Sequence, residues 1–275
     1  ASRWKPGNRA GSQRHRCASV VEHRAEGSGR GGVLMRLRVR FAKTGKVRFV
    51  GHRDVARIWE RSLRKASLSV AYSEGFSPRP KLSFGLALST GYESNAEYLE
   101  IELLEPADDS TWSPVDAEAM RVRIDAVLPA GFDVLAVAPA DRRADSLQQA
   151  VTSCTWEILV DSAGVDEVAT GVADLLGRNE IVVERERKGK VVTEDIRHQV
   201  LALDVTGEAG DGVRLSADLG TQPRALRPDE MLAAMDPPLL ARSVCRMNQW
   251  MSQGDDRIEP LSVDAAPAPL AEVRA

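Results

Sequence analysis

The stretch that decides the fold is GKVRFVGHRDVARIWERSLRKASLSVAYSEGFSPRPKLSFGLALSTGYESNAEY, residues 45–98. It predicts a helix over 53–66, then a turn rich in Gly and Pro, then an apolar strand. Apolar residues recur through the helix at the spacing that places them on one face. Basic residues three to four positions apart form a ridge on the other face. The ridge consists of Arg53, Arg57, Arg61, Arg64 and Lys65.

The segment that follows the helix is a stiff loop, SEGFSPRPK, at residues 73–81. Gly75 permits a positive φ. Pro78 and Pro80 fix their own φ and restrict the residues that precede them. We therefore expect the loop to project Arg79 and Lys81 from a backbone of low conformational freedom.

Outward from this stretch, the chain alternates strands and helices in the order β–α–β–β–α–β. MRLRVRFA, at 35–42, alternates apolar residues with arginine, which predicts a half-buried strand with one cationic face. This element order is typical of a ferredoxin-like split βαβ unit, and the pattern partly repeats after residue 140. We predict an α+β fold with two ferredoxin-like units in tandem. The other elements predicted in the first unit are strands over 68–72, 82–89, 94–104 and 132–138 and a helix over 115–128.

Length and composition set the expected domain boundaries. A chain of 275 residues with 43% apolar content can hold two ordinary domains. Residues 1–34 are rich in Gly, Ser and Arg, so we predict a disordered or spurious N-terminal extension. The first domain is predicted at 35–139, the second at 140–253, and a flexible tail at 254–275.

Charge is distributed unevenly along the chain. Between Arg36 and Lys81 there are 13 Lys/Arg and 3 Asp/Glu, a net charge of +10. Between Leu82 and Leu176 there are 4 Arg and 18 Asp/Glu, a net charge of −14. This asymmetry favours a surface for an anionic partner. The alternative is that the two blocks neutralise each other in the fold.

The basic block also contains aromatic residues, and the two together form the candidate binding site. The planar guanidinium of arginine suits phosphate, and an aromatic ring can stack on a base. Phe76 and Phe84 are favoured as core residues, with base stacking as the alternative. His52 is a weak candidate general base, phosphate contact or helix cap. The residues predicted to bind RNA or a partner are Arg48, His52, Arg53, Arg57, Arg61, Arg64, Tyr72, Arg79 and Lys81.

Several classes of site are missing from the sequence. Cys17, Cys154 and Cys245 are scattered, without metal or redox spacing or a disulfide framework. The sequence has no Ser/His/Asp arrangement, P-loop, zinc spacing or CxxxCxxC triad. We therefore expect no metal and no cofactor in this chain. Without an apolar run of membrane-spanning length or a signal peptide, we expect a cytoplasmic protein with no membrane partner.

Short motifs follow one another through this region: RVRF at 38–41, KTGK at 43–46, GHRD at 51–54, LRKA at 63–66, AYS at 71–73, GFSP at 75–78, PKLSF at 80–84 and EYL at 97–99. On these motifs, residues 35–104 resemble the DUF2344 family of radical-SAM-linked proteins of unknown function, more weakly to about residue 250. Arg79 departs from the family, which usually has His there, so this position is a poor candidate for titration or metal binding.

The resemblance implies a partner more than an activity. Members of the family occur beside, or fused to, a cobalamin-binding radical SAM protein, and their genes often lie near those of an RNase E/G-type ribonuclease and of ribosomal proteins. Our first hypothesis is a non-catalytic accessory protein that presents a structured RNA, rRNA or tRNA, or a ribonucleoprotein to that enzyme. The second is a protein–protein docking module without nucleic acid. The third is a stand-alone RNA-processing enzyme that uses His52 with Arg79 and Lys81 as charge stabilisers.

Overall fold

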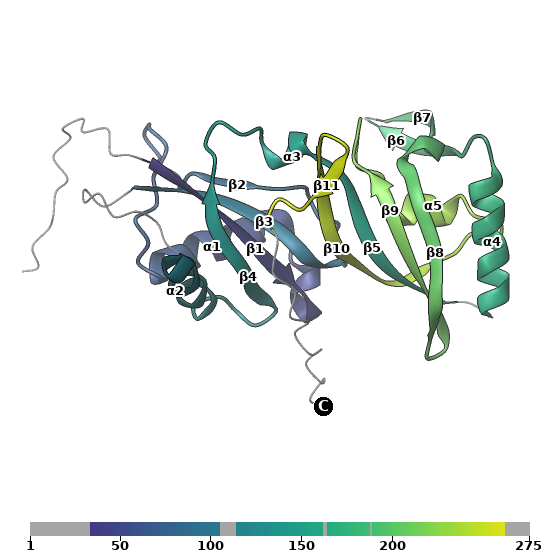
Figure 1. Ribbon diagram of the computed structural model, residues 1–275, viewed down its shortest axis with the longest axis horizontal. Coiled ribbons are helices and arrows are strands. Elements are labelled where there is room, and N and C mark those ends of the chain that lie inside the picture. Colours follow the sequence, from purple (N-terminus) through teal and green to yellow (C-terminus); the bar gives the residue numbers. More distant parts are fainter. Residues whose placement is uncertain (1–33, 105–113, 162–163, 188, 262–275) are drawn as a thin grey trace, which may run out of the picture. The chain divides into compact units, whose positions relative to one another are not determined.

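A computed structural model describes residues 34–104, 114–161, 164–187 and 189–261. The predicted N-terminal extension lies outside these residues, apart from its last position. Helices alternate with strands along the chain (Figure 1). The helices are α1 (His52–Lys65), α2 (Pro114–Asp125), α3 (Leu147–Ala150), α4 (Val165–Gly177) and α5 (Pro228–Ala233), with 3-10 helices η1 (Gly45–Phe49) and η2 (Arg197–Gln199). The strands are β1 (Leu34–Lys43), β2 (Leu82–Phe84), β3 (Glu93–Leu104), β4 (Phe132–Ala140), β5 (Val151–Asp161), β6 (Val182–Arg187), β7 (Lys190–Asp195), β8 (Val200–Ala209), β9 (Gly212–Gly220), β10 (Ala241–Gln253) and β11 (Asp256–Ile258).

Most of these strands belong to one sheet, whose order is β4-β1-β3-β10-β5-β9-β8. β2 pairs with β3, β11 pairs with β10, and β6 and β7 form a separate hairpin. The predicted α+β class is therefore confirmed. None of the helices in the described residues has the length and apolar content that crossing a bilayer requires.

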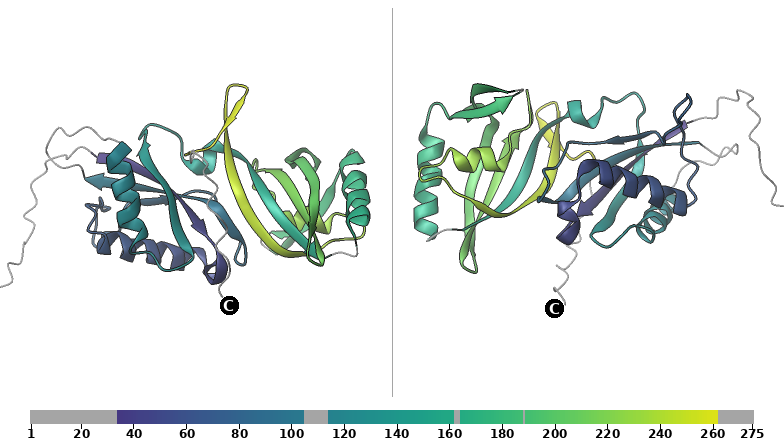
Figure 2. Two further views of the ribbon diagram at one scale, coloured as in Figure 1. Left: turned by 60° about the horizontal axis from the view of Figure 1, so that its bottom comes forward. Right: turned by 180° about the vertical axis from the view of Figure 1, so that it is seen from behind.

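The first part of the sheet has the strand order β4-β1-β3-β2, and all of its neighbouring strands are antiparallel. α1 and α2 cover one face of it (Figures 1 and 2). Trp59 of α1 packs against Phe41 of β1 with ring centroids 4.8 Å apart. The alternation of Leu37, Val39 and Phe41 therefore points into a core, as the sequence predicts.

The second part of the sheet repeats this order as β10-β5-β9-β8, again antiparallel throughout. α4 and α5 cover the face of β5 and β9 that carries Trp156, Ile158 and Val160. The β6–β7 hairpin is inserted between α4 and β8. These equal strand orders favour the assignment of both halves to ferredoxin-like units. That assignment and the domain boundaries remain predictions.

The two parts join where β10 runs parallel to β3, with Cys245 opposite Glu93 and Arg246 opposite Ser94. β2 and β10 both pair with the same edge of β3, but at opposite ends of it. Four strands from the later half, β10, β5, β9 and β8, therefore continue the sheet begun by the earlier half.

The prediction that β1 has an open cationic face is wrong, because other residues cover that face. Arg38 and Arg40 are buried. Arg38 donates to Glu100 over 2.6 Å and to the Pro260 carbonyl over 2.8 Å. Arg40 Nη1 donates to both carboxylate oxygens of Glu259, at 2.9 and 2.8 Å. Charged side chains are buried here because each guanidinium finds carboxylate and carbonyl acceptors.

Other boundaries also differ from the sequence predictions. The stretch predicted as a strand at 68–72 makes only isolated bridges, Val70 to Leu103 and Tyr72 to Pro80. β11 lies at Asp256–Ile258, so the prediction of a flexible tail is wrong for residues 254–261. Residues 262–275 lie outside the described part of the chain.

Candidate functional site

The basic ridge of α1 is exposed along its whole length. All of its five basic residues are exposed, while Val55, Trp59 and Leu63 on the opposite side are buried. A 14-residue helix is roughly 20 Å long at about 1.5 Å per residue. The ridge therefore forms a cationic strip of that length on the face turned away from the sheet.

The acidic block neutralises part of the basic block, as the alternative interpretation of the charge pattern expects. Glu100 pairs with Arg36 and Arg38, Glu93 with Arg48, and Glu102 with Lys81. These carboxylates lie on β3. Arg36 and Arg38 lie on the neighbouring strand β1, so their pairs with Glu100 form across strands, whereas Arg48 lies in η1 and Lys81 lies just before β2. Sequence reasoning grouped Arg48 and Lys81 with the ridge, whereas the structure gives each an acidic partner.

The ridge itself is largely free of acidic partners. Arg57 pairs with Asp54 at 3.0 Å, but both side chains are mostly exposed, so this pair is weak. Within the described residues, Arg53, Arg61, Arg64 and Lys65 form no ion pair. Their charge is available to a partner.

The loop at 73–81 presents an aromatic tip. Phe76 is fully exposed, so the prediction that it belongs to the core is wrong, while Phe84 packs partly buried against the first core. The Arg79 amide donates to Ser73 Oγ at 3.0 Å, and Ser73 N donates to the Arg79 carbonyl at 2.8 Å. These bonds close the loop at its base, and Tyr72, 44% exposed, lies beside that closure.

His52 begins α1 and packs edge-on against Phe84, with ring centroids 5.2 Å apart. No hydrogen bond or ion pair within the described chain joins His52 to Arg79 or Lys81. The structure therefore does not bring the three residues of the proposed cleavage site into contact.

Sequence reasoning missed a cavity of about 640 Å³ on the helix-covered side of the sheet. His52 lies at its edge, and segment 85–89 forms one wall. Trp156 of β5 and Arg246 of β10 belong to its lining, and the chain from Thr221 to Glu230 lies opposite. The lining thus comes from parts of the chain almost 200 residues apart in sequence.

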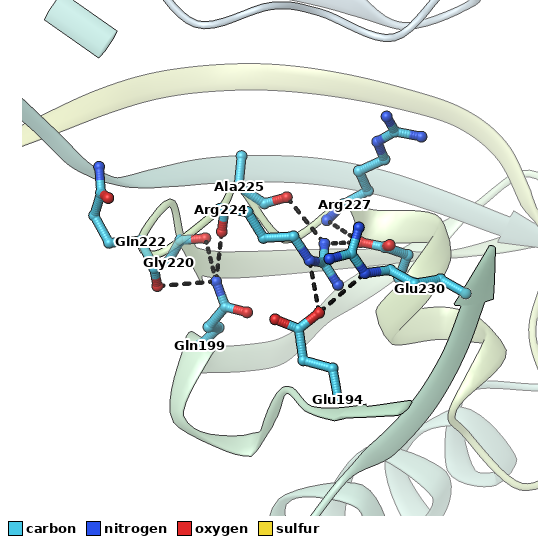
Figure 3. Close-up of polar contacts among 9 residues, drawn as sticks. Glu194, Gln199, Gly220, Gln222, Arg224, Ala225, Arg227 and Glu230 are labelled. Carbon is cyan, nitrogen blue, oxygen red and sulfur yellow. Dashed lines mark hydrogen bonds and ion pairs between the residues drawn. The ribbon is translucent and has the colours of Figure 1, made fainter. Parts of the chain in front are cut away.

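The far wall of the cavity is held by an ion-pair network (Figure 3). Arg224 donates to Glu194 at 2.8 Å and to Glu230 at 2.7 Å, and Arg185 donates to Glu194 at 3.1 Å. These contacts tie the β6–β7 hairpin to the segment before α5. The hydrogen bond from Arg224 lowers the pKa of the Glu194 carboxyl, and this effect outweighs burial, which raises it.

Gln199, which is almost completely buried, also holds this wall in place through hydrogen bonds to its backbone. Its side-chain nitrogen donates to the Gln222 carbonyl at 3.1 Å and to the Arg224 carbonyl at 2.6 Å (Figure 3). Thr221 Oγ1 donates to the Val151 carbonyl at 2.6 Å. The wall is therefore anchored to the sheet before any ligand arrives, which is the condition for a preorganised site.

The cavity floor carries buried charge. Arg246 is 1% exposed, lies 5.4 Å from the Trp156 ring centre and donates to Glu97 and to the Leu86 carbonyl. Lys43, which is also buried, lies outside the cavity lining and donates to the backbone carbonyls of Arg48 and Val50. Burial lowers the pKa of Lys43, Glu97 opposes that shift, and Arg246 adds to it.

Cys154 and Tyr92, two further residues of the cavity lining, keep their protons at neutral pH. Burial raises the pKa of the Cys154 thiol to about 11, so it is not a thiolate nucleophile at neutral pH. Burial, with a hydrogen bond to Asp229, also raises the pKa of Tyr92. Within the described ranges, no three His, Cys, Asp or Glu residues cluster closely enough to hold a metal ion.

One sequence signal for the cavity was available. The strand ARSVCRMNQW alternates, and Arg246 occupies an inward position of the same phase as Val244. An arginine at a core position of a strand implies a buried acceptor or a ligand.

A family model matches residues 36–228, with the description "Uncharacterized protein conserved in bacteria (DUF2344)". The match includes α1, the loop at 73–81 and most of the cavity wall, and it ends before β10. No curated protein matches the chain.

Proposed function

The chain belongs to the DUF2344 family of uncharacterized proteins conserved in bacteria, and from this premise we propose that it is a non-catalytic accessory protein that binds RNA. In this proposal it presents a structured RNA, such as rRNA or tRNA, or a ribonucleoprotein, to a cobalamin-binding radical SAM enzyme. The enzyme partner comes from the resemblance described above. The RNA comes from the surface of the chain itself.

The observation that carries the proposal is the α1 ridge. Four exposed cations on one helix face lack an acidic partner within the described residues: Arg53, Arg61, Arg64 and Lys65. Like charges three to four residues apart destabilise an isolated helix by a few tenths of a kcal/mol per pair. A regularly spaced anionic backbone would offset that cost, and most of the affinity of proteins for nucleic acid comes from such contacts.

The loop at 73–81 adds a second kind of contact. Phe76 is a fully exposed aromatic ring on a loop that two prolines and two hydrogen bonds restrain. An unpaired base can stack on such a ring whatever its identity, and Arg79 nearby supplies charge. Ridge and loop together suit an RNA that has both a helical backbone and unpaired bases.

The experiment is crosslinking of tagged protein to RNA in cells, followed by sequencing. Arg57→Glu/Arg79→Glu disrupts the proposed surface, and Arg142→Glu/Arg143→Glu is the matched control. Arg142 and Arg143 are exposed, and their loop lines a pocket with Arg36, on the face of β1 opposite α1. We expect enrichment of one RNA class that only the first variant loses. Equal signal from both variants would refute an RNA site on α1.

Docking to a protein is the second candidate, and the exposure of Phe76 favours it too. A single exposed aromatic side chain is a typical anchor for a pocket on a protein partner. A binary complex with the radical SAM protein that survives nuclease, but is lost in Phe76→Ser, would support docking without nucleic acid. The stand-alone enzyme would require RNA cleavage that His52→Ala abolishes.

A further inference from the structure

The lining of the cavity carries more positive than negative charge. It includes four arginines, Arg185, Arg224, Arg227 and Arg246, and two glutamates, Glu186 and Glu230. The thiol of Cys154, which also belongs to the lining, stays neutral and does not offset the difference. A cavity lined by more cations than carboxylates favours the arrival of an anion.

Three residues of the cavity lining also carry unpaired donors. Arg246 Nε, Arg224 Nη2 and Trp156 Nε1 are buried nitrogen atoms without a hydrogen-bond partner among the described residues. Buried N–H groups are almost always paired in proteins, so these donors are exceptions. The three atoms are covered by the side chains around them and do not open into the cavity.

Arg227 supplies a cation at the exposed side of the cavity. Its backbone N–H donates to Glu230 at 3.1 Å, and Figure 3 shows its guanidinium directed away from the Glu194–Arg224–Glu230 network. It forms no ion pair with any described acidic residue. This guanidinium is therefore free to contact a ligand without breaking the contacts that hold the wall.

Part of the lining is apolar. Leu86, Leu88, Leu219 and Leu226 contribute, together with the Trp156 ring. The volume of about 640 Å³ lies within the range typical of sites for small organic molecules. Inorganic phosphate alone would leave most of this apolar wall without contact.

We propose that the cavity binds a small organic anion of mononucleotide size, with its phosphate toward Arg246 and Arg227 and its ring against the apolar wall. Two sources supply this chemistry: a free nucleoside monophosphate, and the 5′-phosphorylated end of an RNA strand. His52 lies both at the cavity edge and at the first residue of α1, so an RNA on the ridge would reach this cavity. Binding of the free nucleotide does not depend on the ridge.

The test is calorimetric titration and thermal shift of the full chain with AMP, UMP and inorganic phosphate. A five-nucleotide RNA with and without a 5′-phosphate distinguishes the two sources. We expect AMP or UMP to bind more tightly than phosphate and to raise Tm. Arg227→Gln should weaken binding about tenfold, since it removes one charge-assisted hydrogen bond.

Two further variants address the interior. Ser89→Trp, at the wall of the cavity, fills it without removing a charge and should abolish binding. Arg246→Met should do the same, and if it fails to fold, Ser89→Trp and Arg227→Gln decide the question. Arg242→Gln is the control, because Arg242 is outside the lining and pairs with Asp161 and Asp211.

The results distinguish the alternatives. If Ser89→Trp and Arg227→Gln weaken nucleotide binding and Arg242→Gln does not, the site is established. Binding only of the 5′-phosphorylated RNA, with the same dependence on Arg227, identifies an RNA end as the source. The proposal is overturned if neither AMP, UMP nor the phosphorylated RNA binds the folded protein at millimolar concentration, or if binding ignores Ser89→Trp. A failure of the α1 variants to bind RNA would leave the free-nucleotide result unaffected.

Discussion

Replacing Arg53 and Arg64 with glutamine removes two cations from the α1 ridge, and neither side chain has an ion pair to lose within the described residues. The fold should therefore be unchanged, since both residues are exposed and glutamine is a good helix former. RNA affinity should change in one specific way, which is its dependence on salt.

The expected size follows from which cations are free. The sequence offers 13 basic residues between Arg36 and Lys81, but many are buried or paired. Five exposed cations of the proposed surface have no acidic partner in the described chain: Arg53, Arg61, Arg64, Lys65 and Arg79. Five contacts with single-stranded RNA give a log–log salt slope of about −3.5. Affinity should then fall about a hundredfold between about 50 and about 200 mM salt.

Arg53→Gln/Arg64→Gln leaves three of these contacts. The slope should fall to about −2, and the loss of affinity over the same salt range to about twentyfold. The assay is fluorescence anisotropy with a labelled oligouridine probe, measured at several salt concentrations. Arg142→Gln/Arg143→Gln makes the same change of net charge on the opposite face and should keep the full slope.

Two results would refute this reasoning. A wild-type slope near zero would mean that phosphate contacts do not hold the RNA. Equal slopes for the two double variants would mean that net charge matters and the α1 ridge does not.

Three further predictions concern the loop, the covered face of β1 and the cysteines. Phe76→Ser should leave Tm unchanged, since the ring is fully exposed, and weaken binding of single-stranded RNA about tenfold by anisotropy, the cost of one base stack. Glu100→Ala should lower the free energy of unfolding by about 3–5 kcal/mol in urea titrations, because two arginines lose a buried carboxylate. Tm should fall as pH rises from about 9 towards 11, and Cys154→Ala should flatten that fall, because burial raises the thiol pKa from 9.0 to about 11. Below pH 9 the Cys154 thiol keeps its proton in both the folded and the unfolded chain. Between pH 9 and 11 the unfolded chain releases this proton while the folded chain retains it, so stability declines.

Control variants test the reasoning behind these predictions. Phe84→Ser should lower Tm, because Phe84 packs against the first core. Glu118→Ala removes an exposed carboxylate that pairs with Arg121 and should leave unfolding almost unchanged. Loss of stability in Phe76→Ser, or equal effects of the two glutamate changes, would contradict the burial on which the predictions rest. A pH profile that Cys154→Ala leaves unaltered would assign the decline to other groups.

Local pattern predicts much of this fold. The helix predicted over 53–66 is found at His52–Lys65, and the strand predicted over 132–138 at Phe132–Ala140. These elements have strong periodicity, and their apolar faces point into cores as expected. The exposed ridge of α1 follows from the same spacing.

The predictions that failed concern features that depend on contacts between residues far apart in the sequence. The alternation at 35–42 predicts two faces for β1 but not what covers the second one. Arg40 is buried because Glu259, more than 200 residues later, supplies its partner. Phe76 was favoured as core because large apolar residues are usually buried, whereas its loop holds it outside. The cavity was missed because its lining is assembled only when β3 and β10 pair.

The contact between Arg38 and the Pro260 carbonyl, 222 positions apart in sequence, has a consequence for the order in which the protein is made. A nascent chain emerges from its N-terminal side first, and domains usually fold as units during synthesis. Here β1, β3 and β4 can pair early, yet their arginine-bearing face stays uncovered until residues 259–261 have been translated. Until then, Arg38 depends on Glu100 alone and Arg40 has no carboxylate. We expect a ribosome-bound chain that stops before β11 to be more accessible to proteases and chaperones at this face than the finished protein.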